Sequence, residues 1–222
     1  MATIVLVPGA FHGAWYFSPI LPKLRAAGHD VHALSLTGLG GPEGRQTAAI
    51  NLDTHIEDVV SYIEAERLED VILCGHSYAG LVIAGAADRL PGRIGTLLFL
   101  DALVPNDGDS VWNTWPPAVR DMFIAASADG LVTAAPPGVD PRARAHPLAT
   151  FLQPVRFTGT PYDVERKVYA LCAADENSPF VAIHARVAAQ EGWQTHKLGC
   201  GHDIMNQAPD LLLNLLLETA AG

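Results

Sequence analysis

The chain has 222 residues, 49% of them hydrophobic and 17% charged, and is long enough to bury the core of one globular domain. Its formal net charge is −10, from 24 acidic and 14 basic residues, and no basic cluster interrupts the sequence. We therefore expect neither nucleic acid nor an anionic membrane surface as a partner. The three cysteines, Cys74, Cys172 and Cys200, form no C-x-x-C pair, which indicates neither a disulfide framework nor a zinc site.

Other bulk features concern location and cofactors. No apolar run reaches the roughly 20 residues that a helix needs to cross a bilayer. The first apolar run follows Met1 without the basic start or cleavage site of a signal peptide, so a cytoplasmic protein is expected. No group of histidines, cysteines and acidic residues has the spacing of metal ligands, and neither a metal nor another cofactor is expected. A homodimer is left open.

The first part of the chain alternates apolar runs with other segments. Ile4–Val7 predicts a buried strand, and Ser18-Pro19 predicts the start of a helix that ends at Ala27. Val31–Leu36 predicts a second strand, which leads into the glycine-rich loop Thr37–Arg45.

The same alternation continues up to residue 100. Apolar residues at helical spacing predict a helix over Leu52–Glu66. Val71–Cys74 predicts a third strand, Tyr78–Arg89 a helix rich in small residues, and Leu97–Leu100 a fourth strand. Strands that are separated by helices favour a parallel sheet.

Residues 106–160 break this pattern, because the segment is rich in proline and in large apolar side chains. So many large apolar residues are poor choices for a mobile loop, and we interpret the segment as a short helical lid over a pocket. Trp112, Trp115 and Phe123 are its candidate substrate-binding residues.

After the lid the alternation resumes. Val168–Cys172 predicts a strand, Ser178-Pro179 caps a helix that ends near Gln190, Trp193–Leu198 predicts the last strand, and Pro209 opens the final helix. The prediction for the whole chain, residues 1–222, is one α/β domain with a mostly parallel, doubly wound sheet and a lid insertion.

The segment Gly75-His76-Ser77-Tyr78-Ala79-Gly80 lies between a predicted strand and a predicted helix. A serine hydroxyl is a weak nucleophile unless a fixed geometry presents it to a base. A sharp strand-to-helix turn presents it in this way but needs small residues two positions to either side, here Gly75 and Ala79. Ser77 is therefore the candidate nucleophile, and the helix that follows points backbone N–H groups towards a developing oxyanion.

The glycine-containing loop Val7–Trp15 follows the first strand, where a second oxyanion donor is expected. Its glycines allow a backbone N–H, that of Ala10, to face the pocket. We interpret His12, in the same loop, as a structural residue that bonds within the turn.

The general base is predicted to be His202, in a glycine-flanked loop between the last strand and the final helix. Such a loop ends at the same edge of a parallel sheet as the Ser77 loop, so the two side chains can meet. A histidine base also needs an acid that fixes its tautomer. Asp175, after the preceding strand, is the predicted acid and Asp101, after the fourth strand, is its rival; Asp203 is expected to point away.

The order serine, aspartate, histidine on an alternating α/β chain resembles the α/β-hydrolase superfamily. The segments Pro8–Trp15 and Gly75–Tyr78 are similar to those of a small esterase branch that includes plant methylesterases, hydroxynitrile lyases and bacterial pyrethroid-hydrolase-like esterases. The resemblance spans nearly the whole chain and is weakest in the lid. It implies an acid at Asp175 and oxyanion donors at the N–H groups of Ala10 and Tyr78.

Two departures from that branch bear on activity. The plant hydroxynitrile lyases carry a lysine after the histidine and a threonine in the first loop, where this chain has Asp203 and Gly9. Cyanohydrin cleavage is therefore disfavoured. The lid is also shorter than in the plant enzymes, so the pocket size and the substrate of this chain are not inferred from theirs.

These features together predict a cofactor-free serine esterase that cleaves a small hydrophobic or aromatic carboxylic ester through an acyl-enzyme. Two alternatives stay open. The same three residues serve lyases, thioesterases and cyclases, and the same pocket serves a small-molecule receptor with residual hydrolysis.

Overall fold

A computed structural model describes residues 1–40, 49–127 and 130–222. Its centre is a six-stranded sheet in which every neighbouring pair of strands is parallel. The spatial order is β2-β1-β3-β4-β7-β8, with β1 Thr3–Val7, β2 Asp30–Ala33, β3 Val71–His76, β4 Ile94–Leu100, β7 Arg166–Cys172 and β8 Trp193–Leu198. The predicted α/β fold with its parallel sheet is confirmed.

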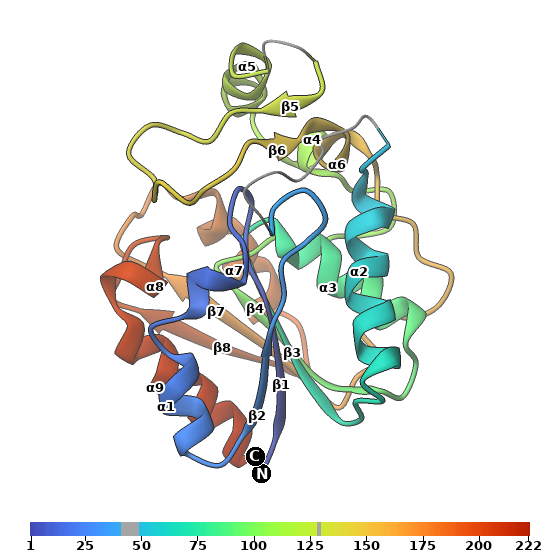
Figure 1. Cartoon of the computed structure of the whole chain (residues 1–222), viewed down its shortest axis with the longest axis vertical. Helices are drawn as coiled ribbons and strands as arrows, with labels where there is room; N and C mark the ends of the chain where they lie inside the picture. Colours follow the sequence, from blue (N-terminus) through green and yellow to red (C-terminus); the bar gives the residue numbers. More distant parts are fainter. Residues whose placement is uncertain (41–48, 128–129) are drawn as a thin grey trace.

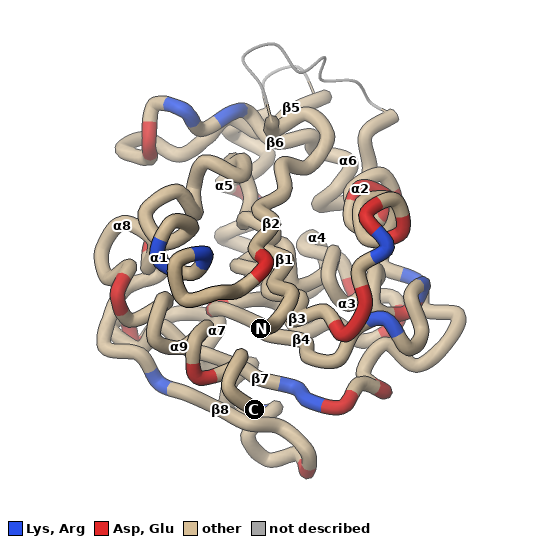
Figure 2. The backbone as a smooth tube through the Cα atoms, turned by 60° about the horizontal axis from the view of Figure 1, so that its bottom comes forward, with Lys and Arg blue, Asp and Glu red and all other residues tan. Residues whose placement is uncertain are grey.

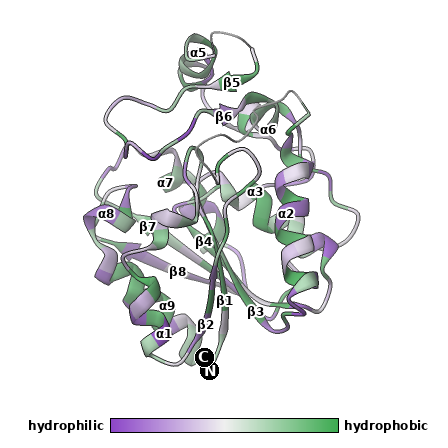
Figure 3. Cartoon of the chain, viewed as in Figure 1, coloured by the Kyte–Doolittle hydropathy of each residue, from purple (hydrophilic) through white to green (hydrophobic). Residues whose placement is uncertain are grey.

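Helices cover both faces of the sheet (Figure 1). One face carries α2 Leu52–Ala65, α3 Ala79–Arg89 and α7 Pro179–Ala188, and the other carries α1 Leu21–Ala26, α8 Ile204–Gln207 and α9 Pro209–Ala221. Residues along each strand alternate between these two cores: Leu97 and Phe99 face the first, Leu98 and Leu100 the second. Because the central strands β1, β3 and β4 are buried on both faces, they are mostly apolar, whereas the edge strand β8 is polar and partly exposed (Figure 3).

The predicted strands and helices of the sheet region are present with bounds that differ by up to three residues, and the first helix is the clear exception. Ser18 does not start it: the segment Ala14–Phe17 forms a 3₁₀ helix with Ser18 as its C-cap, and α1 begins at Leu21 with Pro22 near its start. The second strand also ends three residues earlier than predicted, at Ala33. The part of the loop Thr37–Arg45 beyond residue 40 lies outside the described residues.

The lid lies above the carboxyl ends of the strands, at the top of Figure 1. It holds the predicted helices as α4 Val111–Thr114, α5 Pro117–Ala125 and α6 Leu148–Leu152. It also holds an antiparallel pair that the sequence did not suggest, β5 Val132–Thr133 with β6 His146–Pro147.

Charged residues are dispersed over the periphery. Figure 2 shows Lys and Arg positions interspersed with Asp and Glu positions along the outer helices and loops. Across the described ranges, none of the helices combines the length and the apolar character that crossing a membrane requires.

Candidate active site

Ser77 lies in the turn between β3 and α3, with a positive φ of 56° that is costly for a residue with a side chain. Surrounding contacts hold it there: its N–H donates to Leu100 O at 3.2 Å, and its carbonyl accepts from Gly80 N and Leu103 N, both at 3.1 Å. A Cβ on Gly75 would lie 2.9 Å from Ala79 O, so this turn needs the small residue that the motif supplies.

The loop after β1 approaches the nucleophile turn very closely. A Cβ on Gly9 would lie 3.0 Å from Ser77 Cβ, so only glycine fits there without displacement. Ala10 and Tyr78 both line the cavity beside Ser77. Within the described ranges, neither backbone N–H donates to another group of the chain. Two such donors beside a serine hydroxyl form the arrangement that stabilises an oxyanion.

His202 connects the nucleophile to a carboxylate. Its Nε2 lies 3.1 Å from Ser77 Oγ, and its Nδ1 lies 2.6 Å from Asp101 Oδ2. The ring stacks on Phe180, with centroids 5.0 Å apart and planes 8° apart. An acceptor at Nδ1 fixes the tautomer whose Nε2 lone pair faces the serine, so the three residues can work as nucleophile, base and orienting acid.

The structure corrects the prediction that Asp175 is the partner of His202. Asp175 is exposed in the turn after β7, where its carboxylate accepts from Asn177 N at 2.9 Å. Asp101 is 1% exposed and has a positive φ of 42° at the end of β4. Its second carboxylate oxygen accepts from Cys172 N at 3.0 Å, and its own N–H donates to Ala170 O at 2.7 Å. These two bonds to β7 hold the Asp101 side chain beside His202, whereas Asp175 lies in a solvent-exposed turn.

Two further polar residues near the site, His12 and Asp203, form hydrogen bonds to groups other than Ser77 and His202. His12 makes a hydrogen bond from Nδ1 to Ala10 O at 2.7 Å, within its own turn as predicted, and burial lowers its pKa. The carboxylate of Asp203 accepts from Tyr16 OH at 2.5 Å and from Asn206 Nδ2 at 3.0 Å, as expected for a side chain that is not the partner of His202. It nevertheless lines the cavity.

A cavity of about 380 Å³ lies over Ser77, between the sheet edge and the lid. Most of its wall is apolar and aromatic, and the lid residues in it include Val111, Trp115, Met122, Phe123 and Val139. Of the three lid residues predicted to bind substrate, Trp115 and Phe123 are therefore in the wall. The third, Trp112, is not: its ring lies under the Arg120 guanidinium instead, 5.8 Å from ring centroid to Cζ.

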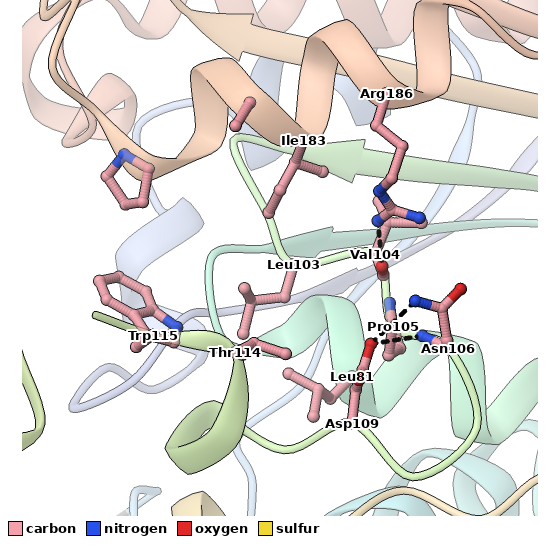
Figure 4. Close-up of a pocket in the computed structure, with 12 residues that line it drawn as sticks. Leu81, Leu103, Val104, Pro105, Asn106, Asp109, Thr114, Trp115, Ile183 and Arg186 are labelled. Atoms are coloured by element: carbon pink, nitrogen blue, oxygen red, sulfur yellow. Dashed lines mark hydrogen bonds between the residues drawn. The ribbon is translucent and has the colours of Figure 1, made fainter. Parts of the chain in front are cut away.

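A second cavity, of about 270 Å³, is drawn in Figure 4 and shares lining residues with the first. Leu103 and Trp115 line both, so these two side chains form the partition. The far wall comes from α7, with Ile183 and Arg186, and Arg186 donates to Val104 O. Trp115 packs edge-on against Phe180 and Phe123, which fixes its ring across this boundary.

Removing the partition should change substrate choice. In Trp115→Ala the two cavities should join, and the rate on bulky esters relative to acetate esters should rise by about tenfold, the range that one altered pocket contact supplies. Trp112→Ala is the matched control, since Trp112 lies outside both cavity walls. Ratios of kcat/KM across an ester series measure the effect; equal losses on all esters in Trp115→Ala would assign the residue to folding.

Several residues of the site carry no sequence signal. Gly80 follows the nucleophile turn, and a Cβ there would collide with Leu103 O at 1.8 Å. Phe180, which stacks on His202, resembles any core residue of an amphipathic helix. His146 is a fully buried lid histidine whose surroundings come from distant segments. Among the described residues, no group of three or more histidine, cysteine or acidic side chains could hold a metal ion.

Comparison with known proteins identifies the family of the chain. A carbendazim hydrolyzing esterase of Nocardioides sp. is 39% identical over 97% of this chain and 98% of its own. Methylesterase 10 of Arabidopsis thaliana is 37% identical over 52% of this chain and 40% of its own. An extracellular α/β-hydrolase from a Paenibacillus species has the same fold, with a TM-score of 0.84, 21% identity and 98% of both chains covered. The model of the alpha/beta hydrolase family matches residues 4–215, and the chain belongs to this family.

Proposed function

We propose that this protein is a serine esterase that cleaves carboxylic esters of small hydrophobic or aromatic substrates. The observation that carries the proposal is the unbroken path from Ser77 Oγ through both nitrogens of His202 to the buried carboxylate of Asp101, at 3.1 Å and 2.6 Å. The esterase relative, aligned over nearly its whole length, supports the same reaction class.

In the proposed mechanism, His202 Nε2 takes the hydroxyl proton as Ser77 Oγ attacks the ester carbonyl carbon. The N–H groups of Ala10 and Tyr78 stabilise the oxyanion of the tetrahedral intermediate. His202 then donates the proton to the departing alcohol, which leaves an acyl group on Ser77. A water molecule, activated by the same nitrogen, attacks that acyl group and releases the acid. Asp101 holds the Nδ1–H of the ring throughout.

The volume and the apolar wall of the cavity favour a small, apolar substrate. A volume of about 380 Å³ with a largely aromatic wall suits a single ring or a short chain. The lyase alternative has less support, because the carboxylate of Asp203 lines the cavity where the plant hydroxynitrile lyases carry a lysine. A carboxylate at that position repels a cyanide anion instead of stabilising it.

Turnover on a series of p-nitrophenyl esters tests the proposal. We expect hydrolysis of acetate, butyrate and benzoate esters that is unchanged after dialysis against EDTA, together with one fluorophosphonate label per chain. Absence of both turnover and labelling in folded protein would contradict the esterase assignment, and loss of turnover in EDTA with recovery in zinc would contradict the serine mechanism. The cytoplasmic location stays a prediction, and a homodimer stays an open alternative that sedimentation tests.

A further inference from the structure

His146, a buried histidine of the lid, has no part in the proposed mechanism. His146 starts β6 in the lid and is 0% exposed. Its ring stacks on Phe151, with centroids 4.4 Å apart and planes 14° apart, and meets the edges of Tyr78 and Phe11 at 4.8 Å and 5.6 Å. An imidazole is an unusual choice for such an aromatic core, because burial of a polar ring costs free energy unless its nitrogens are bonded.

His146 forms a hydrogen bond to the loop that follows β1. Phe11 N donates to His146 Nδ1 at 3.2 Å, across 135 residues of sequence. The lid also supplies the partner of the Phe11 carbonyl, which accepts from Arg144 N at 2.9 Å. Both backbone polar groups of Phe11 are thus paired with the lid.

Phe11 needs this support because of its backbone conformation. Its φ is 71°, in the left-handed region that residues with a side chain adopt at a cost. Such a conformation persists where surrounding contacts over-determine it. The ring of Phe11 adds one more contact, edge-on to Phe151 at 6.3 Å.

The conformation of Phe11 determines where Ala10 lies. Phe11 N and the Ala10 carbonyl belong to one planar peptide group. His146 holds its N–H end, and His12 Nδ1 holds its carbonyl end at 2.7 Å. The Ala10 N–H belongs to the preceding peptide group, whose Gly9 carbonyl accepts from His12 N at 3.4 Å. Because the two peptide planes share Ala10 Cα, holding both of them restricts the rotation of the Ala10 N–H in the loop that lines the cavity beside Ser77.

We propose that His146 is a positioning residue for the oxyanion hole: through it the lid holds the Ala10–Phe11 peptide group and so restricts the orientation of the adjacent Ala10 N–H. The inference rests on the proposed esterase function. It makes the lid part of the catalytic apparatus as well as the wall of the cavity. The bond requires a neutral imidazole with an unprotonated Nδ1, and burial keeps the pKa of His146 well below its usual value, so Nδ1 stays an acceptor.

A pair of amide variants tests the proposal. His146→Asn places its side-chain oxygen where Nδ1 lies, whereas His146→Gln displaces the oxygen towards the position of Nε2. Misplacement of one oxyanion donor should lower kcat of His146→Gln by ~10–100-fold. His146→Asn should stay within about threefold of the wild type, and KM should change by less than about threefold in both.

A second readout addresses the oxyanion hole directly. An aryl trifluoromethyl ketone forms a tetrahedral adduct with a serine hydroxyl, whereas the corresponding methyl ketone only fills the pocket. The inhibition constant of the trifluoromethyl ketone should rise in His146→Gln by the same factor as kcat falls, ~10–100-fold, with methyl ketone binding unchanged. His184→Gln, at a largely buried histidine of α7 next to Tyr169, is the control and should match the wild type.

The outcomes separate this proposal from the esterase assignment. Wild-type protein without ester turnover or fluorophosphonate labelling would contradict the esterase assignment itself. With an active wild type, equal losses in the Asn and Gln variants, or a Gln variant as active as the wild type, would overturn the positioning role. If His146→Gln fails to fold, His146→Leu replaces it with the same expected losses, and unfolding of both would assign His146 to stability alone.

Discussion

Replacement of Asp101 by asparagine should lower kcat by ~10⁴-fold while the protein stays folded. The carboxylate oxygen that lies 2.6 Å from His202 Nδ1 would be replaced by an amide N–H, which donates to an unprotonated Nδ1. The imidazole would then carry its proton on Nε2, and this nitrogen could not take a proton from Ser77. The remaining amide oxygen can still accept from Cys172 N, which preserves the link to β7. Steady-state kinetics together with circular dichroism measure both parts of this expectation.

Asp175→Asn is the matched control for this experiment. Asp175 is exposed and bonds to Asn177 N in its own turn, so its replacement should change kcat by less than about twofold. The opposite result, a folded but inactive Asp175→Asn beside an active Asp101→Asn, would restore the assignment that the sequence favours.

Ser77→Ala should have the largest effect, a loss of kcat by ~10⁶-fold with full loss of fluorophosphonate labelling. Without the hydroxyl, His202 has no proton to take and the ester carbonyl has no nucleophile. The turn itself should survive, because its backbone bonds to Leu100, Gly80 and Leu103 do not involve the side chain. Ser61→Ala, on the exposed face of α2, is the control and should retain activity and labelling.

Much of the fold follows from local patterns in the sequence. Apolar runs such as Val71–Cys74 are buried on both faces of a parallel sheet, and they are recognisable because both faces demand apolar residues. The Ser77 turn is recognisable for a similar reason: Gly75 and Ala79 satisfy a steric requirement that acts within five residues. His202 follows from the rule that loops at one edge of a parallel sheet meet.

Local patterns do not identify the acid that bonds to His202, because two aspartates, Asp101 and Asp175, follow neighbouring strands at the same edge of the sheet. Which one reaches His202 depends on backbone direction at the strand end, and the left-handed conformation of Asp101 leaves no mark in the sequence. The hydrogen bond between Cys172 N and its carboxylate joins positions 71 residues apart. The resemblance to the esterase branch implied Asp175 as the acid, whereas in this chain His202 bonds to Asp101 and Asp175 bonds to Asn177 N.

The lid shows the same limit. Its apolar composition predicts a cover for a pocket, but not which tryptophan faces inwards. Trp115 packs between Phe123 and Phe180, whereas Trp112 lies against Arg120. Composition also does not reveal the hydrogen bond from Phe11 N to His146 Nδ1. This bond forms because the lid packs on the loop that follows β1, 135 residues earlier in the sequence.

In the proposed reaction, an ester is cleaved through a covalent acyl group on Ser77. Rapid acid quenching of the protein with a p-nitrophenyl ester, followed by mass spectrometry of its peptides, tests this directly. We expect a mass increase of one acyl group on the peptide that contains Ser77, formed within the first turnover and absent in Ser77→Ala. Acylation at another residue, or ester turnover that persists undiminished in Ser77→Ala, would contradict it.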